Sequence, residues 1–288
     1  MKERFLKKEY LYMLLIAIAL QIGVYYYVDQ VVLLPAASFS QEAVLDVSKL
    51  PANPAHVSYD KKYYVEMQSQ GVVFYQDNNI ITEIPIKEED RITDFSWVPE
   101  THLALIAISG IMSDDTTLSL KIYDVENDRF IQEQQIIGVP SDSKIVAAVY
   151  SSQFNVSYVL VKDNKASSIY RTAKNNFPVK LSTSSPVSQI ALLPGTDILL
   201  FDNQDTYAIY TIDEKSKQKM ISPREEQYAL IGTDRDSNIY IGQLTSEGLI
   251  STILKGTLDG GFTEVQPLEN PYPVASVTVS YDGKLAYN

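Results

Sequence analysis

Hydrophobic residues are distributed in two ways along this chain. From Tyr10 to Val28 they form a run interrupted only by Gln21 and Gly23, which at about 1.5 Å per residue is long enough to cross a bilayer as a helix. Beyond it they occur in short β-type runs separated by polar turns. The pattern predicts one transmembrane helix over residues 10–34, ended by Pro35, and an all-β domain over residues 55–288.

The charges around the apolar run predict its orientation. Four basic residues precede the run: Lys2, Arg4, Lys7 and Lys8. The first charge after it is Asp29. Because basic flanks stay in the cytoplasm, residues 1–9 are predicted to be a cytoplasmic tail. We therefore expect a single-pass protein of the cell membrane, held by the lipid bilayer, with an extracytoplasmic C-terminal domain.

Two further interpretations of the N-terminal segment depend on its small residues. Ala36, Ala37 and Ser38 are of the type that signal peptidase accepts, so a cleaved signal peptide is the alternative to an anchor. The apolar run exceeds a signal core of about 7 to 15 residues, which favours the anchor. Ala19 and Gly23 have the small-xxx-small spacing that allows a second helix to approach, so they are candidate helix-packing residues.

The net charge and the cysteine content restrict the cellular environment and the classes of binding partner that the sequence predicts. The net charge is −12, and because the first 34 residues hold four basic and three acidic side chains, the remainder carries −13. An acidic domain of this kind does not bind nucleic acid by neutralising phosphates. The chain has no cysteine, which excludes disulfides and a lipoprotein anchor. This composition is typical of a bacterial cell envelope.

Within residues 55–288 the pattern predicts β-hairpins. Three segments each contain two β-type runs joined by Asp- or Asn-rich turns, at residues 71–86, 118–137 and 228–244. The preceding residues 35–54 contain three prolines and are predicted to be a linker, with a lone strand at Val44 to Val47.

A short internal repeat indicates how the hairpins are organised. Residues 57–62 read VSYDKK and residues 279–284 read VSYDGK, and weaker copies at 95–100, 149–152 and 191–196 also precede strands. The 222 positions between the first and last copies divide into five intervals of about 44 residues, the size of a propeller blade. The repeat predicts a β-propeller-like fold of about six blades, with repeat turns at Asp60, Asp282 and Gly283.

The run Ser280-Tyr281-Asp282-Gly283-Lys284 resembles the Ser-Pro-Asp-Gly-Lys turn of TolB-like, or WD40-like PD40, propeller repeats, which also occur in propellers attached to prolyl oligopeptidase-type peptidases. Tyr59 and Tyr281 occupy the position where that family usually has proline. The resemblance implies that this turn joins the innermost strand of a blade to the second one. Its role there is structural, so no active-site residue follows from it.

The last copy of the repeat leaves material for only two strands. A sixth blade therefore needs a strand from elsewhere, and Val44 to Val47 can supply it as a clasp that closes the ring. Two β-sandwich domains of about 110 residues each are the alternative architecture.

Catalytic patterns are weak throughout the sequence. The only histidines are His56 and His102, and no Gly-x-Ser-x-Gly motif presents a serine nucleophile. Ser58 with Lys61, and Ser141 with Lys144, have a Ser-x-x-Lys spacing but lack the accompanying motifs of penicillin-recognising enzymes. We expect no enzyme activity of these types and no cofactor.

Acidic and aromatic residues were the remaining candidates for chemistry. Residues 234–238 read DRDSN, the opening of a calcium loop, but lack its glycine and distal glutamate. They are better interpreted as a hairpin turn. Other acidic clusters lie at residues 88–90, 114–115 and 225–226. The twenty tyrosines and Trp97 are interpreted mainly as packing between blades.

Three functions are compatible with these observations. The first is a membrane-anchored extracytoplasmic binding or scaffold protein that presents a propeller to an envelope protein or polymer. The second is an accessory subunit of a membrane transporter or sensor complex that acts through its transmembrane helix. The third is an envelope hydrolase that uses carboxylates gathered at the propeller's central opening.

Overall fold

The fold was analysed in a computed structural model of the chain, which describes residues 21, 56–112, 115–173, 176–183 and 185–287. The predicted helix from Tyr10 to Val28, its packing residues Ala19 and Gly23, and the predicted strand at Val44 to Val47 lie outside the described residues. Among the described residues, no helix is long and apolar enough to span a membrane. Ser48–Asn288 forms one compact unit, separate from Met1–Val47.

The described residues from 56 onward form six antiparallel sheets. The first contains β1 (His56–Val57), β2 (Tyr63–Gln68), β3 (Gly71–Gln76) and β4 (Asn79–Pro85). The second contains β5 (Arg91–Trp97), β6 (Leu103–Met112), β7 (Asp115–Asp124) and β8 (Arg129–Val139). The third contains β9 (Lys144–Ser151), β10 (Val156–Lys162), β11 (Ser167–Ala173) and β12 (Val179–Lys180).

The fourth sheet contains β13 (Ile190–Leu192), β14 (Leu199–Asn203), β15 (Ala208–Ile212) and β16 (Gln218–Met220). The fifth contains β17 (Tyr228–Thr233), β18 (Ile239–Leu244), β19 (Leu249–Thr257) and β20 (Gly261–Pro273). After the short 3₁₀-helix η4 (Val274–Ser276), the sixth sheet contains only β21 (Val277–Val279) and β22 (Leu285–Tyr287).

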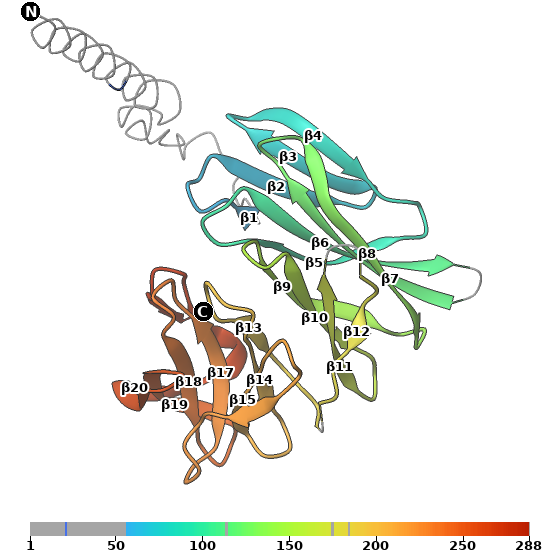
Figure 1. Cartoon of the computed structure of the whole chain (residues 1–288). Helices are drawn as coiled ribbons and strands as arrows, with labels where there is room; N and C mark the ends of the chain where they lie inside the picture. The colour runs from blue at the N-terminus through green and yellow to red at the C-terminus, as the bar shows by residue number, and fades with distance from the viewer. Residues whose placement is uncertain (1–20, 22–55, 113–114, 174–175, 184, 288) are drawn as a thin grey trace, which may run out of the picture. The chain divides into compact units, whose positions relative to one another are not determined.

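Strand order within every sheet follows the chain, and the sheets succeed one another from the blue to the red end of the colour scale (Figure 1). Such consecutive four-stranded meanders are typical of propeller blades, whereas sandwich domains join their sheets by Greek-key crossings. The three predicted hairpins are confirmed as β3–β4, β7–β8 and β17–β18. The unit is therefore all-β and propeller-like.

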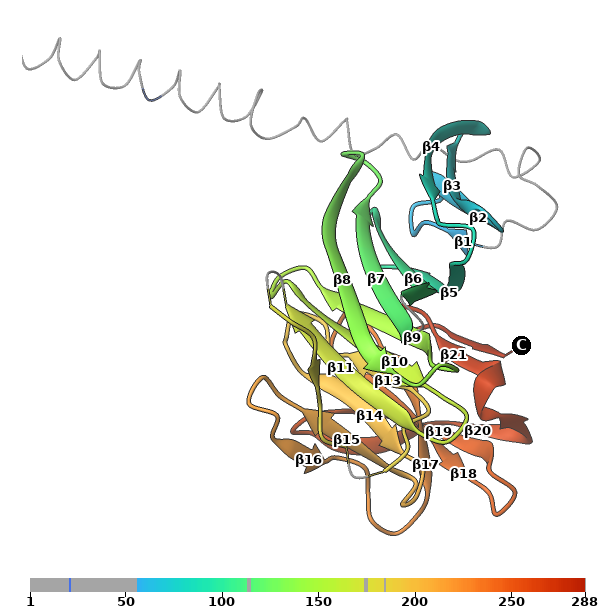
Figure 2. The same ribbon diagram turned by 90° about the vertical axis from the view of Figure 1, so that its right-hand side faces the viewer.

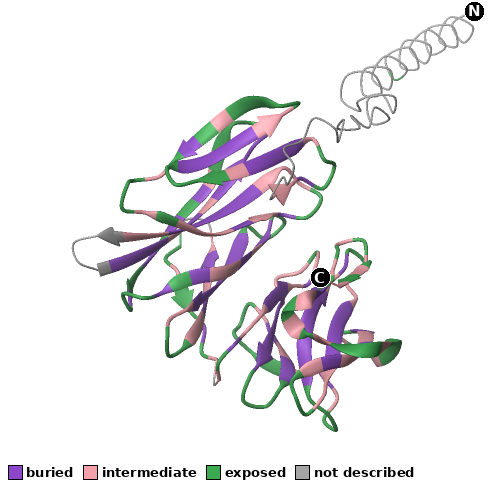
Figure 3. Cartoon of the chain, turned by 180° about the vertical axis from the view of Figure 1, so that it is seen from behind, coloured by how far each residue is buried: buried purple, intermediate pink, exposed green. Residues whose placement is uncertain are grey.

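Each hydrophobic core is shared by two consecutive sheets. Along β6, Ala104 and Ile106 pack into the core between the first and second sheets, whereas Leu105 and Ala107 pack into the core between the second and third. Because successive side chains of a strand point to opposite faces, a strand with two buried faces needs a continuous apolar run. This explains the sequence LALIAI from residue 103. Buried residues accordingly lie in the middle strands of the sheets, and exposed residues lie in the turns and the outer strands (Figure 3).

The blades are less regular than the predicted period of about 44 residues. Their first strands begin at His56, Arg91, Lys144, Ile190, Tyr228 and Val277, so the spacing varies from 35 to 53 residues. The largest spacing follows from the second sheet, where β6, β7 and β8 have 10, 10 and 11 residues. The number of residues between the first strands of consecutive sheets is thus set by the length of the hairpins in each sheet.

Candidate binding site

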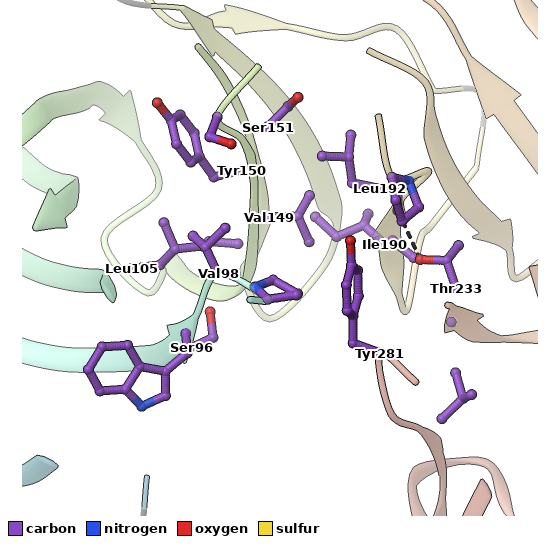
Figure 4. Close-up of a pocket in the computed structure, with 18 of the residues that line it drawn as sticks. Ser96, Val98, Leu105, Val149, Tyr150, Ser151, Ile190, Leu192, Thr233 and Tyr281 are labelled. Carbon is purple, nitrogen blue, oxygen red and sulfur yellow. Dashed lines mark hydrogen bonds between the residues drawn. The ribbon is translucent and has the colours of Figure 1, made fainter. Parts of the chain in front are cut away.

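The first strands of five sheets line a pocket of about 410 Å³ (Figure 4). The side chains and backbone come from β5, β9, β13, β17 and β21, from turns that follow some of these strands, from Leu105 of β6 and from Gln189 before β13. In Figure 4, Ser96, Val98 and Leu105 lie on one side of the pocket, while Ile190, Leu192 and Tyr281 lie on the other. Because five consecutive blades contribute, the pocket exists only when they are assembled.

A glycine allows the last two blades to approach each other at this pocket. Gly232 has φ +154°, and a Cβ placed on it would lie 2.8 Å from Cγ1 of Val279. That separation is shorter than a van der Waals contact, and the backbone conformation disfavours L side chains. Gly232 therefore permits β21 to pack closely against β17.

Hydrogen bonds fix part of the pocket wall and leave one hydroxyl free. The Gln189 Nε2 donates to the Ile231 carbonyl at 3.0 Å, and the Thr233 hydroxyl donates to the Leu192 carbonyl at 2.9 Å (Figure 4). Both bonds join the fourth sheet to the fifth. By contrast, the buried Ser96 Oγ has no hydrogen-bond partner among the described residues. It is an unsatisfied polar group buried in the pocket wall.

The pocket wall is electrically neutral. None of the described residues that line it is Asp, Glu, His, Lys or Arg, and the ionisable groups among them are the tyrosines Tyr150 and Tyr281. Burial raises the pKa of Tyr150, and burial together with the charge of Glu100 raises the pKa of Tyr281. Both phenols are uncharged near neutral pH. The wall is suited to binding neutral groups and lacks the carboxylates that the hydrolase hypothesis places at this opening.

The turns that follow the first strands of consecutive sheets meet beside the pocket. The Ser237 hydroxyl donates to the Pro194 carbonyl at 3.2 Å, and the Arg235 amide donates to the Tyr281 carbonyl at 2.8 Å. Five of these six turns present an aromatic or proline side chain: Tyr59, Pro99, Phe154, Pro194 and Tyr281. Tyr59 and Phe154 are 55% and 45% exposed. The turns thus carry contact groups suited to a protein or glycan partner.

The predicted repeat turns have the structural role that the resemblance implies. Asp60 lies between β1 and β2, and Asp282 and Gly283 lie between β21 and β22. Ser58 and Ser280 donate hydrogen bonds to Asp60 and Asp282 respectively. Lys61 and Gly283 occupy the same turn position, with φ values of +61° and +78°. The two copies therefore fold alike, and glycine simply relieves the strain that Lys61 accepts.

Hydrogen bonds to these aspartates hold their carboxylates ionised. Those from Lys284 and Ser280 lower the pKa of Asp282 to about 2. Burial on its own would raise the pKa of Asp60, but hydrogen bonds from the Lys62 amide, Ser58 and His102 outweigh it and lower that pKa. Both carboxylates are therefore occupied in their turns rather than free for chemistry.

His102 links the first two blades. Its Nε2 lies 2.9 Å from the Asp60 carboxylate and its Nδ1 lies 3.3 Å from the Glu126 carboxylate. The ring also stacks on Tyr59 and meets Tyr63 edge-on. The Ser58 hydroxyl in this cluster donates to the Asp60 carboxylate and not to the imidazole, so the cluster is an inter-blade contact and not a nucleophile–base pair. His56, the other histidine, lies on β1 against Phe95.

The sequence DRDSN at residues 234–238 forms the β17–β18 turn, as its preferred interpretation predicted. Asp234 is buried, and its carboxylate accepts hydrogen bonds from the amides of Asp236 and Asn238, the Asn238 side chain and the Tyr240 hydroxyl. Lys255 Nζ lies 3.7 Å away. Within the described residues, no three His, Cys, Asp or Glu side chains are arranged to hold a metal.

The other acidic clusters lie away from the pocket. Residues 88–90 belong to the β4–β5 connection and residues 225–226 to the β16–β17 connection, and position 114 is outside the described residues. One carboxylate is on a pocket-forming strand: burial raises the pKa of Asp94, whose carboxyl accepts hydrogen bonds from the Phe95 and Ala148 amides. A single carboxylate tied to backbone amides does not supply the pair that glycoside hydrolysis requires.

The residues that line the pocket were not predicted, although the sequence contained a signal for them. Its wall includes the degenerate repeat copies at residues 95–100, 149–152 and 191–196. Those copies were interpreted only as entries to strands. Since the first strand of every blade faces the propeller axis, a repeat that marks first strands also marks the residues that line a central pocket.

Comparison with solved structures supports the fold assignment. The chain is similar to Porphyromonas gingivalis dipeptidyl peptidase 4, with 13% identity and a TM-score of 0.51 over 75% of this chain and 38% of that one. It is also similar to Kuenenia stuttgartiensis hydrazine synthase, with 16% identity and a TM-score of 0.51 over 80% of this chain and 71% of that one.

A third similar structure is Pyrococcus horikoshii acylaminoacyl peptidase, with 15% identity and a TM-score of 0.50 over 74% of this chain and 38% of that one. This chain thus spans well under half the length of the two peptidases. These neighbours have propeller-like β-folds, and at such identities they establish the fold alone. No protein-family model and no curated protein matches the chain.

The Asp234 network generates a pH-dependent prediction. Burial alone would raise the pKa of Asp234, but hydrogen bonds from Asn238 and Tyr240 and the charge of Lys255 together lower it. A lowered pKa stabilises the folded state above the unfolded value of about 3.9, and this contribution disappears as pH falls through the folded value. We expect Asp234→Asn to lower the free energy of unfolding by about 1–3 kcal/mol at pH 7.

The difference between wild type and Asp234→Asn should shrink as the pH is lowered below about 4. Urea unfolding at several pH values measures it. Asp205→Asn, on the exposed β14–β15 turn, is the matched control and should change stability little. A difference that stays constant down to pH 2 would show that ionisation of Asp234 does not stabilise the fold.

Proposed function

We propose that this chain is a membrane-anchored, extracytoplasmic binding or scaffold protein of a bacterial cell envelope. The observation that carries the proposal is the neutral pocket, which is built from the first strands of five blades and bordered by turns bearing aromatic and proline residues. A rigid concave site with apolar walls and a few polar groups is typical of a binding surface. Its partner is an envelope protein or polymer, and recognition uses the propeller.

The anchor in this proposal is the apolar segment from Tyr10 to Val28, with the N-terminus in the cytoplasm. Its length and its basic flank support a single span. The alternative function, an accessory subunit of a transporter or sensor complex, uses the same helix as the recognition element through Ala19 and Gly23. The two functions differ in which part of the chain selects the partner.

Cysteine labelling tests the topology, because the chain contains no native cysteine. In intact cells, a membrane-impermeant maleimide should label Lys215→Cys, on an exposed loop, and should label Glu3→Cys only after lysis. Both variants should remain in the membrane fraction after carbonate extraction. Equal labelling at both sites in intact cells, or release of the protein into the medium as after signal-peptide cleavage, would contradict the proposed anchor.

A substitution that obstructs the pocket tests whether the pocket binds the partner. Ser152 lines the pocket and is exposed, so Ser152→Trp should block the mouth without disturbing the core. Cross-linking in cells followed by mass spectrometry should show at least about tenfold less partner with this variant, the effect of losing about 1.4 kcal/mol of binding free energy. Ser141→Trp, on the exposed β8–β9 connection, is the matched control and should retain the partner.

A chain in which an unrelated anchor replaces residues 1–34 separates the two functions. If the propeller recognises the partner, this chimera retains it and loses it again on Ser152→Trp. Partners that require the native helix and are indifferent to Ser152→Trp would instead support the accessory-subunit function.

We further propose that the fold is a six-bladed propeller of the PD40 type whose last blade is completed by Val44 to Val47. In the described residues β22 pairs only with β21. The connections from one sheet to the next contain 3 to 9 residues, and the eight residues between Val47 and His56 fall in this range. Leu45 and Val47 would share one face of such a strand and cover the partly buried Leu285 and Tyr287.

Introduced disulfides test the clasp. With Ala286→Cys on β22, a second cysteine placed in turn at positions 44 to 47 should form an intramolecular disulfide in at least one full-length variant, because paired strands bring Cβ atoms within about 5.5 Å. Glu247→Cys, on the exposed β18–β19 turn, replaces Ala286→Cys in the control and should form none. Failure of all four pairs with Ala286→Cys would rule out this clasp.

A further inference from the structure

The outermost strand of each complete sheet has an edge without a neighbouring strand. These edges differ in how well they are protected against pairing with a strand of another chain. β12 and β16 contain two and three residues, and β20 carries Pro267, Pro271 and Pro273. Short strands and prolines both prevent pairing with another chain. β8 instead extends over eleven residues and contains neither proline nor lysine. Its pairing with β7 is regular over residues 132–136, which form an edge stretch without proline or lysine.

The free side of β8 is open to a partner. Within the described residues, its backbone hydrogen bonds run to β7, and none reaches it from the opposite side (Figure 2). A groove of about 420 Å³ runs beside it, between residues 131–135 and residues 176–178. Apolar side chains stand exposed here: Ile137 on β8 is 71% exposed and Phe177 across the groove is 92% exposed. Such exposed apolar groups beside an unpaired edge mark an interaction site.

Charge favours a second copy of this chain as the occupant. The protein carries a net charge of −12, so two copies repel each other over most of their surfaces. β8 holds one positive and one negative residue, Arg129 and Glu133, and is locally neutral. Because charges farther apart than about 8 Å are screened at physiological salt, a neutral strip is where two such acidic molecules can approach.

The order of residues in β8 is compatible with antiparallel pairing to itself. A two-fold axis at Gln134 places Glu133 opposite Gln135 of the second copy. These two residues lie within residues 132–136, where the pairing of β8 with β7 is regular, and alternate along the strand, so they share one face. The pairing sets an amide beside a carboxylate, without opposing like charges. Each copy presents the same surface, as a two-fold interface requires.

We propose that β8 is a homodimerisation edge, along which two copies of this chain pair as antiparallel strands centred on Gln134. Phe177 of each copy then lies beside the strand that the other inserts into the groove. A contact of one strand pair is smaller than the roughly 1,200–2,000 Å² of a stable interface. The dimer is therefore weak and concentration-dependent, and its formation is independent of what the central pocket binds.

Cross-linking of the full-length chain tests the register. Two differently tagged preparations, Glu133→Cys and Gln135→Cys, are mixed and treated with a short thiol-specific cross-linker. Because these positions face each other in the proposed pairing, the mixture should give about fivefold more dimer than either variant alone. Asp205→Cys, on an exposed turn elsewhere, should give only background. Equal yields from all samples, or no dimer in the mixture, would overturn the proposal.

Ile137→Lys provides a second test that does not depend on cysteine placement within the pair. The side chain is mostly exposed, so thermal unfolding should be unchanged, while a lysine on the edge opposes strand pairing. Introduced into both cysteine variants, it should reduce the dimer from the mixture to the background level. An undiminished yield would show that the copies do not meet along β8.

Discussion

Every sheet of this protein depends on its neighbours for burial. The five hydrophobic cores lie between consecutive sheets, so a strand such as β6 contributes one set of side chains to the sheet before it and the alternate set to the sheet after it. A β-sheet that must bury both faces cannot be stable alone. This shared burial brings the first strands of the sheets together, and the neutral pocket is a consequence of that convergence.

Local features of the fold were predictable because short-range chemistry determines them. The turn residues Asp60 and Asp282 fix their hairpins through hydrogen bonds within four residues. The hairpins at residues 71–86, 118–137 and 228–244 followed from alternating runs and turn residues. The repeat predicted the propeller-like class, since the copies at residues 57–62, 95–100, 149–152, 191–196 and 279–284 fall in five of the six sheets.

The site was less predictable, for a physical reason. Ser96 and Thr233 are ordinary strand residues and Gln189 directly precedes a strand, and their shared location depends on how five sheets pack. The variation in blade length was not predicted either. β7 and β8 form a long hairpin, and no local sequence signal marks where these strands end. Spatial relationships between sheets are not encoded in the residues of any one turn.

From the second and third sheets onward, the cores of the described residues become smaller along the chain. Thirteen buried residues form the core between the second and third sheets, eight the core between the fourth and fifth, and five the core that β21 joins. In a linear array of units, stability spreads from the best-packed interface outward. Folding of this unit is therefore expected to nucleate around the second and third sheets, while slow exchange of the amide hydrogens of β21 and β22 with solvent depends on the strand that completes their sheet.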